Sequence, residues 1–122
     1  MQDNGKIHSG QRAEENAYQY LRAQGLKLIT RNYRCFSGEI DLIMQDNDYL
    51  VFVEVRSRNR TDYGTACESV TWKKQSKIIK TAMYFLQQKK EWHTLHLRFD
   101  IIGISANQIE WIKDAFSADI LL

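Results

Sequence analysis

The chain has 122 residues, of which 43% are hydrophobic and 26% are charged, and its formal net charge is +2. These values are ordinary for a globular protein and exclude a disordered or collagen-like chain. The longest apolar runs are strand-sized, far short of the roughly twenty residues that a membrane helix needs. We expect one domain over residues 1–122, with no membrane contact. Two cysteines without metal-ligand spacing, and an N-terminus with no apolar signal core, favour the cytoplasm.

Positive charge is concentrated in one part of the sequence. Residues 56–90 contain nine lysines and arginines against two acidic residues, whereas residues 99–122 contain one lysine against four acids. A basic segment of this kind suits the phosphates of a nucleic acid. Lys73, Lys77 and Lys80 follow one another at helical spacing, which predicts a cationic stripe on one helix face.

Hydrophobic periodicity predicts the element order α, β, β, β, α, β, β. In chain order, we expect a helix from Ser9 to about Gln24, strands over 26–34, from Gly38 and from Tyr49, a helix capped by Thr71 and running to about Lys90, and strands over 97–105 and 109–113. Gly25 is a natural left-handed terminator for the first helix. This order predicts an α/β fold with a mixed central sheet flanked by helices.

The first helix carries an acid beside its apolar stripe. Its inward-facing positions are Ala13, Ala17, Tyr18 and Leu21. Glu14 precedes Ala17 and Tyr18 by three and four residues, so its carboxylate lies at the edge of the stripe. We therefore expect Glu14 to point toward the sheet.

The stretch GEIDLIMQDNDYLVFVEVRSR, residues 38–58, predicts a hairpin with acids on one face. Strand side chains alternate, so Ile40, Leu42 and Met44 share one face and Asp41 lies on the other. Any loop of even length keeps this parity and places Asp41 beside Glu54 of the partner strand. Leu50 and Phe52 share the face of Glu54, which indicates that the acids lie in a covered cleft.

Two neighbouring carboxylates repel each other, and a divalent cation between them would remove that cost. Magnesium favours a few carboxylates plus water, so Asp41, Glu54 and Glu14 predict a site for Mg²⁺ or Mn²⁺. Arg56 follows Glu54 on the same face, where its charge could stabilise a phosphate. The competing interpretation is a half-solvated hairpin whose Glu54 and Arg56 make weak surface contacts.

Several motifs resemble the YraN family of bacterial proteins, within the superfamily of restriction-endonuclease-like nucleases with PD-(D/E)xK sites. The resemblance covers nearly the whole chain, and GEIDLI followed by FVEVR is its most specific part. The other matching segments are GQRAEENAYQYL, RNYR, LVFVEVRSR, SVTWKKQSKI, RFDII and IEWIKDAF.

This resemblance implies a three-layer restriction-endonuclease-like fold and metal-dependent hydrolysis of DNA phosphodiester bonds, on branched or damaged DNA as in Holliday-junction resolvases. It assigns catalytic roles to Asp41, Glu54, Arg56 and Glu14, and metal binding to the three acids among them. By analogy with resolvases, a homodimer is a further expectation. Ala13 stands where the family usually has glycine, and Arg56 stands where the superfamily has lysine.

Arginine cannot accept a proton, so Arg56 could only orient or stabilise the phosphate. Lys74 is an alternative source of an ammonium group at the site, with Lys73 and Lys77 as weaker candidates. Contacts to DNA are expected from Arg58, Arg60, Lys73, Lys74 and Lys77. Two other functions stay open: a DNA-binding module of the same fold without catalysis, and an interaction protein whose acids bind a basic partner.

Overall fold

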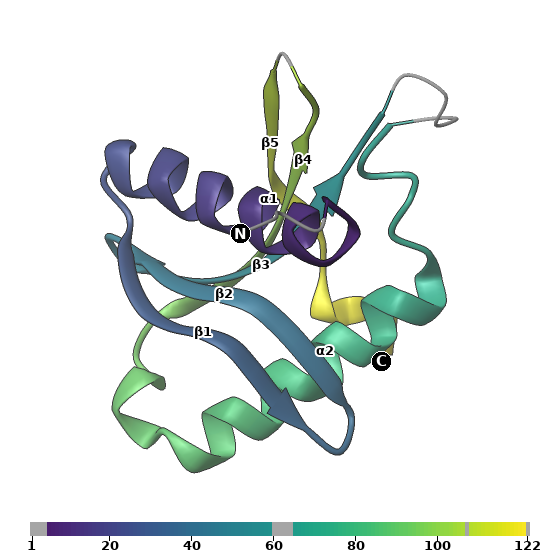
Figure 1. Cartoon of the computed structure of the whole chain (residues 1–122). Helices are drawn as coiled ribbons and strands as arrows, with labels where there is room; N and C mark the ends of the chain where they lie inside the picture. Colours follow the sequence, from purple (N-terminus) through teal and green to yellow (C-terminus); the bar gives the residue numbers. More distant parts are fainter. Residues whose placement is uncertain (1–4, 60–64, 107, 122) are drawn as a thin grey trace.

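A five-stranded mixed sheet forms the centre of the molecule (Figure 1). The computed structural model describes residues 5–59, 65–106 and 108–121. Strands lie in the order β1-β2-β3-β4-β5; β3 and β4 are parallel and the other neighbours are antiparallel. The elements are α1 (Gly5–Ala23), β1 (Lys27–Cys35), β2 (Gly38–Asp46), β3 (Tyr49–Ser57), α2 (Trp72–Gln88), η1 (Lys90–Trp92), β4 (His96–Ile104), β5 (Ile109–Phe116) and η2 (Ala118–Leu121). The predicted α/β architecture and element order are confirmed.

The two long helices cover opposite faces of the sheet, because each face carries its own apolar cluster. Ala13, Ala17 and Leu21 of α1 pack on Val51 and Val53 of β3. On the other face, apolar side chains of α2 pack with Leu50 and Phe52, the neighbours of these valines along β3; the α2 members are Ile78, Ile79, Ala82 and Phe85. Alternation along β3 therefore builds two cores. None of the described helices is long and apolar enough to cross a membrane.

Both helices end or begin as the sequence suggests, with one exception. Gly25 has φ +102°, and its N–H and that of Leu26 donate to Arg22 and Leu21, closing the last turn of α1. Thr71 caps α2 by accepting the Lys74 N–H at 3.2 Å. Ser9 was expected to cap α1, but the helix begins at Gly5, so Ser9 lies inside it.

β2 and β3 are hydrogen-bonded only over the half of their hairpin next to the turn, and they separate beyond it. These strands pair from Leu42 and Val53 toward their turn, and beyond this point β2 pairs with β1 whereas β3 pairs with β4. Asn32, opposite this point on β1, has φ +54°. The far half of the β1–β2 hairpin turns toward α2 (Figure 1).

This split overturns one expectation about the faces of β2. Ile40 was expected on the face of Leu42 and Met44, but it packs in the α2 cluster with Ile43. The alternation is therefore interrupted at Asp41, where β2 leaves β3. Gly38 also faces α2, and a Cβ at that position would lie 3.3 Å from the Thr81 hydroxyl.

The buried carboxylate of Asp100 pairs with Arg98 on the same strand, β4, and joins β4 to β5. The Asp100 side chain is fully buried and accepts hydrogen bonds at 2.9 Å from Arg98 Nε, Arg98 Nη2 and Trp111 Nε1. It also accepts from the Asp114 N–H at 3.0 Å, where β5 bulges with φ +55° at Asp114.

Candidate active site

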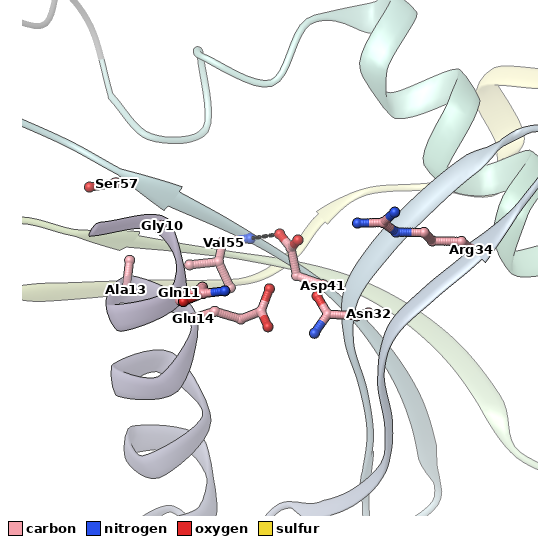
Figure 2. Close-up of a pocket in the computed structure, with 9 residues that line it drawn as sticks. All are labelled: Gly10, Gln11, Ala13, Glu14, Asn32, Arg34, Asp41, Val55 and Ser57. Atoms are coloured by element: carbon pink, nitrogen blue, oxygen red, sulfur yellow. Dashed lines mark hydrogen bonds between the residues drawn. The ribbon is translucent and has the colours of Figure 1, made fainter. Parts of the chain in front are cut away.

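Asp41 occupies the point at which β2 and β3 part. The Val55 N–H loses its ladder partner there, and Asp41 Oδ2 accepts it at 2.8 Å (Figure 2). An unpaired backbone donor next to the core would be costly, so this carboxylate stabilises the split. Asp41 is thus held in place by the strand geometry, between the two faces of the sheet.

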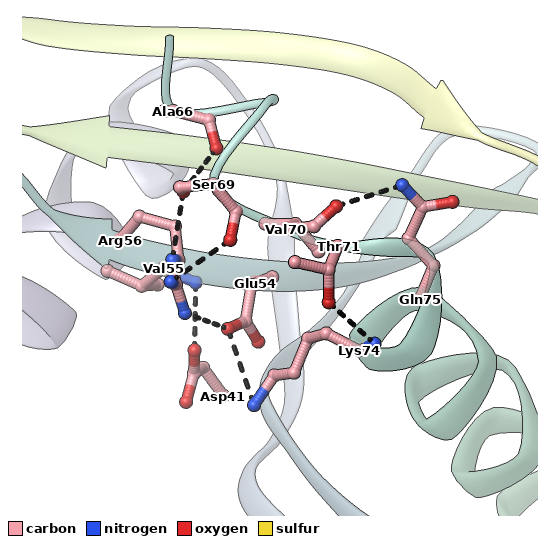
Figure 3. Close-up of polar contacts among 10 residues, drawn as sticks. All are labelled: Asp41, Glu54, Val55, Arg56, Ala66, Ser69, Val70, Thr71, Lys74 and Gln75. Carbon is pink, nitrogen blue, oxygen red and sulfur yellow. Dashed lines mark hydrogen bonds and ion pairs between the residues drawn. The ribbon is translucent and has the colours of Figure 1, made fainter. Parts of the chain in front are cut away.

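Glu54 is the buried acid beside Asp41. Its side chain is 7% exposed and lies on the α2 side of β3. Glu54 Oε2 is 3.3 Å from Arg56 Nη1 and 3.7 Å from Lys74 Nζ (Figure 3). Lys74 comes from the first turn of α2, so the two cations reach the acid from different elements. The surface-hairpin interpretation does not fit so deeply buried a carboxylate.

Arg56 is fixed on its other side by the turn before α2. Its Nε donates to Ser69 Oγ at 3.1 Å, and its Nη2 donates to the Ser69 carbonyl at 3.2 Å. Ser69 Oγ in turn donates to the Ala66 carbonyl at 2.6 Å (Figure 3). All three guanidinium nitrogens therefore donate to protein acceptors, and the arginine holds the turn against β3.

Both acids favour their protonated forms more than free carboxyls do. Burial, and then the negative charge of Asp41, raise the pKa of Glu54 to about 7, although Lys74 and Arg56 act in the opposite direction. Burial also raises the pKa of Asp41, against the hydrogen bond from the Val55 N–H. Neighbouring buried carboxyls with shifted pKa values are typical of a functional site.

Glu14 enters from α1 on the opposite side of Asp41. Partial burial and the charge of Asp41 raise the pKa of Glu14, while a hydrogen bond from the Asn32 side chain lowers it. Glu14, Asn32 and Asp41 line a cavity of about 440 Å³ between α1 and the hairpin (Figure 2). Its other lining residues are Gly10, Gln11, Ala13, Arg34, Val55 and Ser57. As expected, Glu14 points toward the sheet.

The donor chemistry fits a hard divalent cation with an incomplete protein shell. Asp41 and Glu54 supply carboxylate oxygens, and a cation between them would offset both burial and mutual repulsion. In the described part of the chain, however, no three acidic, histidine or cysteine side chains converge closely enough to form a metal cage. Magnesium needs few protein ligands because it retains water, so two carboxylates are compatible with it.

The remaining predicted residues lie at different distances from this centre. Lys74 reaches Glu54, whereas Lys73 and Lys77 are exposed on α2. Arg58 lines a separate pocket near the β4–β5 turn, and Arg60 falls outside the described residues. Glu39, also on β2, forms an ion pair with Arg34 Nε at 3.0 Å.

Sequence reasoning missed the residues that support the acids. Ser69 carries no periodic or motif signal, and its role depends on how the turn before α2 folds back on Arg56. Asn32 offered a weak signal, because asparagine tolerates the left-handed conformation that it adopts here. Its contact with Glu14 joins β1 to α1, which the order of elements alone does not predict.

Known proteins are similar to this sequence along most of its length. A model of the uncharacterised protein family UPF0102 matches residues 13–104, a range that includes Glu14, Asp41, Glu54 and Lys74. A UPF0102 protein of Pseudomonas fluorescens (strain Pf0-1) is 41% identical over 120 residues, which cover 97% of this chain and 100% of its own. A UPF0102 protein of Saccharophagus degradans is 50% identical over 109 residues, or 89% of this chain and 92% of its own. A third, from Legionella pneumophila, is 44% identical over 111 residues, or 89% of this chain and 94% of its own. The resemblance to the YraN family, which is the UPF0102 family, is confirmed, and the chain belongs to the uncharacterised protein family UPF0102.

Proposed function

We propose that this protein is a metal-dependent phosphodiesterase acting on DNA, built on a restriction-endonuclease-like version of the α/β sheet. The observation that carries the proposal is the burial of Glu54 beside Asp41, with Lys74 and Arg56 at the same carboxylate. Adjacent acids and cations are the groups that phosphoryl chemistry requires, and Asp41 among them lines a cavity. A stability role alone does not call for two adjacent, largely buried carboxyls with raised pKa values.

Asp41 and Glu54 would hold Mg²⁺ or Mn²⁺, with Glu14 near enough to Asp41 to bind a water of the metal. When bound, such an ion supplies a Lewis acid and lowers the pKa of coordinated water. The protein's own contribution is to fix Asp41 through the Val55 N–H and to keep Glu54 out of bulk solvent. The 440 Å³ cavity gives a phosphate access to Asp41.

Lys74 would take the role of the superfamily's lysine, whose position is occupied here by Arg56. Its ammonium group lies 3.7 Å from Glu54 and sits on a rigid helix turn, so it can donate to a phosphate oxygen at the same centre. The hydrogen bonds of Arg56 to Ser69 fix the position of its guanidinium beside Glu54. Arg56 is therefore a positioning residue for Glu54 in this proposal.

Linear, nicked, flapped and four-way DNA incubated with Mn²⁺ would test this function. We expect cleavage of at least one substrate, dependent on the metal and reduced at least about a hundredfold in Glu54→Gln and Asp41→Asn, because losing a metal ligand removes several kcal/mol of transition-state stabilisation. The amide oxygen of Asp41→Asn can still accept the Val55 N–H, which preserves the strand split. Calorimetric titration with Mn²⁺ gives a second readout that does not depend on the substrate.

Glu91→Gln is the matched control, because it also removes one carboxylate, at an exposed position on η1, which follows the end of α2 opposite to Lys74. Cleavage and Mn²⁺ affinity should match the wild type within about twofold, since an exposed charge contributes little. Cleavage that persists in Glu54→Gln would remove the proposed site. Folding of each variant is checked by its circular dichroism spectrum.

One observation favours a second candidate, a DNA-binding module without catalysis. Glu54 is paired with two cations inside the protein, and such a carboxylate is partly neutralised before any metal arrives. A binding module would hold DNA equally in EDTA and in Mn²⁺ and would cleave none of the four substrates. The third possibility, an acid cluster that binds a basic protein partner, predicts neither DNA binding nor cleavage.

A further inference from the structure

The tip of the β1–β2 hairpin exposes an aromatic ring beside α2. Phe36 lies in the turn between Cys35 and Gly38 and is 88% exposed, which is unusual for a phenylalanine in an ordered turn. Its ring meets the edge of Tyr84 on α2, with ring centroids 5.4 Å apart and planes at 85°. Phe36 and Tyr84, named here the aromatic tip, are therefore held by two elements rather than by a free loop.

A line of lysines joins this aromatic tip to the acids. Lys73, Lys77, Lys80 and Tyr84 follow one another at i, i+4, i+7 and i+11, which places them on one face of α2. The three lysines, named here the lysine stripe, are exposed. The stripe begins next to Lys74, which reaches Glu54, and the hairpin lies along it, since Gly38 faces Lys77 and Thr81. Ten residues of helix from Lys74 to Tyr84 span about 15 Å.

We propose that the aromatic tip is a stacking site for an unpaired nucleobase of a DNA strand whose backbone follows the lysine stripe from the acids. This inference rests on the proposed action on DNA and assigns its substrate class: DNA with a single-stranded segment next to the reacting phosphate. Aromatic rings that alternate with cations are the usual platform for single strands. For a strand that keeps the spacing of about 3.4 Å per nucleotide that each strand has in duplex DNA, the tip meets a base about four positions from that phosphate.

Charge selects the occupant of this surface. A second copy of the chain or another apolar protein surface would have to lie over the lysine stripe, which favours a polyanion instead. Among the possible polyanions, a fully paired duplex hides the faces of its bases in the stack, so the Phe36 ring would have nothing to stack on. An unpaired strand supplies both phosphates for the lysines and a free base face for the ring.

Equilibrium binding in EDTA tests the inference without any cleavage. Labelled single strands, a flapped substrate and a blunt duplex are titrated with wild type, Phe36→Ala and Phe36→Trp. We expect Phe36→Ala to weaken binding of the single strand and the flap about tenfold, the loss of one stacked base, and to change duplex binding less than twofold. Phe36→Trp should restore the affinity. In addition, 2-aminopurine scanned along the flap should be quenched most strongly about four nucleotides from the junction.

Leu28→Ala is the matched control, because Leu28 is a 38% exposed apolar residue on the same hairpin, near its opposite end. It should leave all affinities unchanged. Equal binding by Phe36→Ala and wild type would overturn the inference, as would a Phe36→Ala effect confined to self-association in sedimentation velocity. Failure of the proposed function looks different: single strands still bind through Phe36, but no substrate is cut in Mn²⁺.

Discussion

The surroundings of Glu54 set the charge of the site as a function of pH. An isolated glutamate has a pKa of 4.5, and burial together with the charge of Asp41 raises it to about 7 in the folded protein. Between these values the folded state carries a proton that the unfolded chain has lost. Stability from this group is therefore complete below pH 4.5 and is lost as pH rises through 7.

We expect the free energy of unfolding to fall from pH 5 to pH 8, with a contribution from Glu54 on the order of 3 kcal/mol. Urea unfolding in EDTA at several pH values measures this decline. Glu54→Gln cannot ionise, so its curve should be flatter and should lie above the wild type at pH 8. Parallel curves for the two proteins would show that Glu54 titrates as an ordinary acid.

Glu15→Gln provides the control with the opposite sign. Glu15 is exposed on α1, and hydrogen bonds from Gln19 and Arg31 lower its pKa below 4.5. Its contribution to stability is present above pH 4.5 and is lost only as the solution becomes more acidic. The slope between pH 5 and pH 8 should therefore be the same in Glu15→Gln as in the wild type.

At the scale of elements, Asp100 of β4 holds β5 against β4, and Arg98 of β4 neutralises its buried charge. Asp100 has no exposed surface and accepts from Arg98, from the Trp111 indole and from the Asp114 N–H. Asp46 contacts the same guanidinium at 3.1 Å, but its side chain is 19% exposed. One arginine thus contacts a deeply buried carboxylate and a half-buried one.

Asp100→Ala should destabilise the protein by about 3 to 5 kcal/mol, because it leaves Arg98 as a buried charge without its main partner and removes the acceptor of two further donors. Asp46→Ala should cost about 1 kcal/mol, since water can replace this carboxylate. Urea midpoints at pH 7 measure both. Similar losses in the two variants would mean that Asp100 is no more important than a surface partner.

The sequence predicts those features of the elements that depend on residues close together in the chain. A helix start is decided locally, so the Thr71 cap was predicted correctly, and Lys74, named as an alternative ammonium source at that helix start, does reach Glu54. Strand alternation is also local, and it correctly placed Leu42 with Met44 on one face and Leu50 with Phe52 on the other. The face of Ile40 depends on where β2 leaves β3. That point lies opposite Asn32, which has a positive φ on the neighbouring strand β1. The pattern of residues within β2 alone does not contain this information.

The same limit applies to the candidate site. The sequence predicted that Asp41 and Glu54 would be neighbours, because both lie in one hairpin. It did not predict the Ser69 carbonyl and hydroxyl at Arg56, which come from a turn more than ten residues away. Contacts that join separate elements depend on the path of the connecting turns, and here those contacts hold the acids in place.

Across the whole molecule, a net charge of +2 conceals a strongly uneven distribution. The lysine stripe lies on α2, beside the acids, while Lys27 and Lys113 lie on β1 and β5. Nonspecific attraction depends on total charge, whereas counterion release depends on which lysines touch phosphates. Variants of equal net charge can therefore separate a bound surface from a general electrostatic effect.

The double variant Lys77→Ala/Lys80→Ala should reduce the steepness with which the affinity for a single strand falls as salt increases. Each phosphate contact contributes about 0.7 to the slope of log K against log salt for single strands, so the slope should drop by about 1.4. Lys27→Ala/Lys113→Ala carries the same net charge and should keep the wild-type slope. Fluorescence anisotropy in EDTA between about 50 and 200 mM salt, the range over which such contacts change affinity by orders of magnitude, measures both slopes. An equal decrease in the two variants would place the DNA elsewhere on the molecule. Only a strand lying along α2 makes Lys77 and Lys80 contribute more to the salt slope than Lys27 and Lys113.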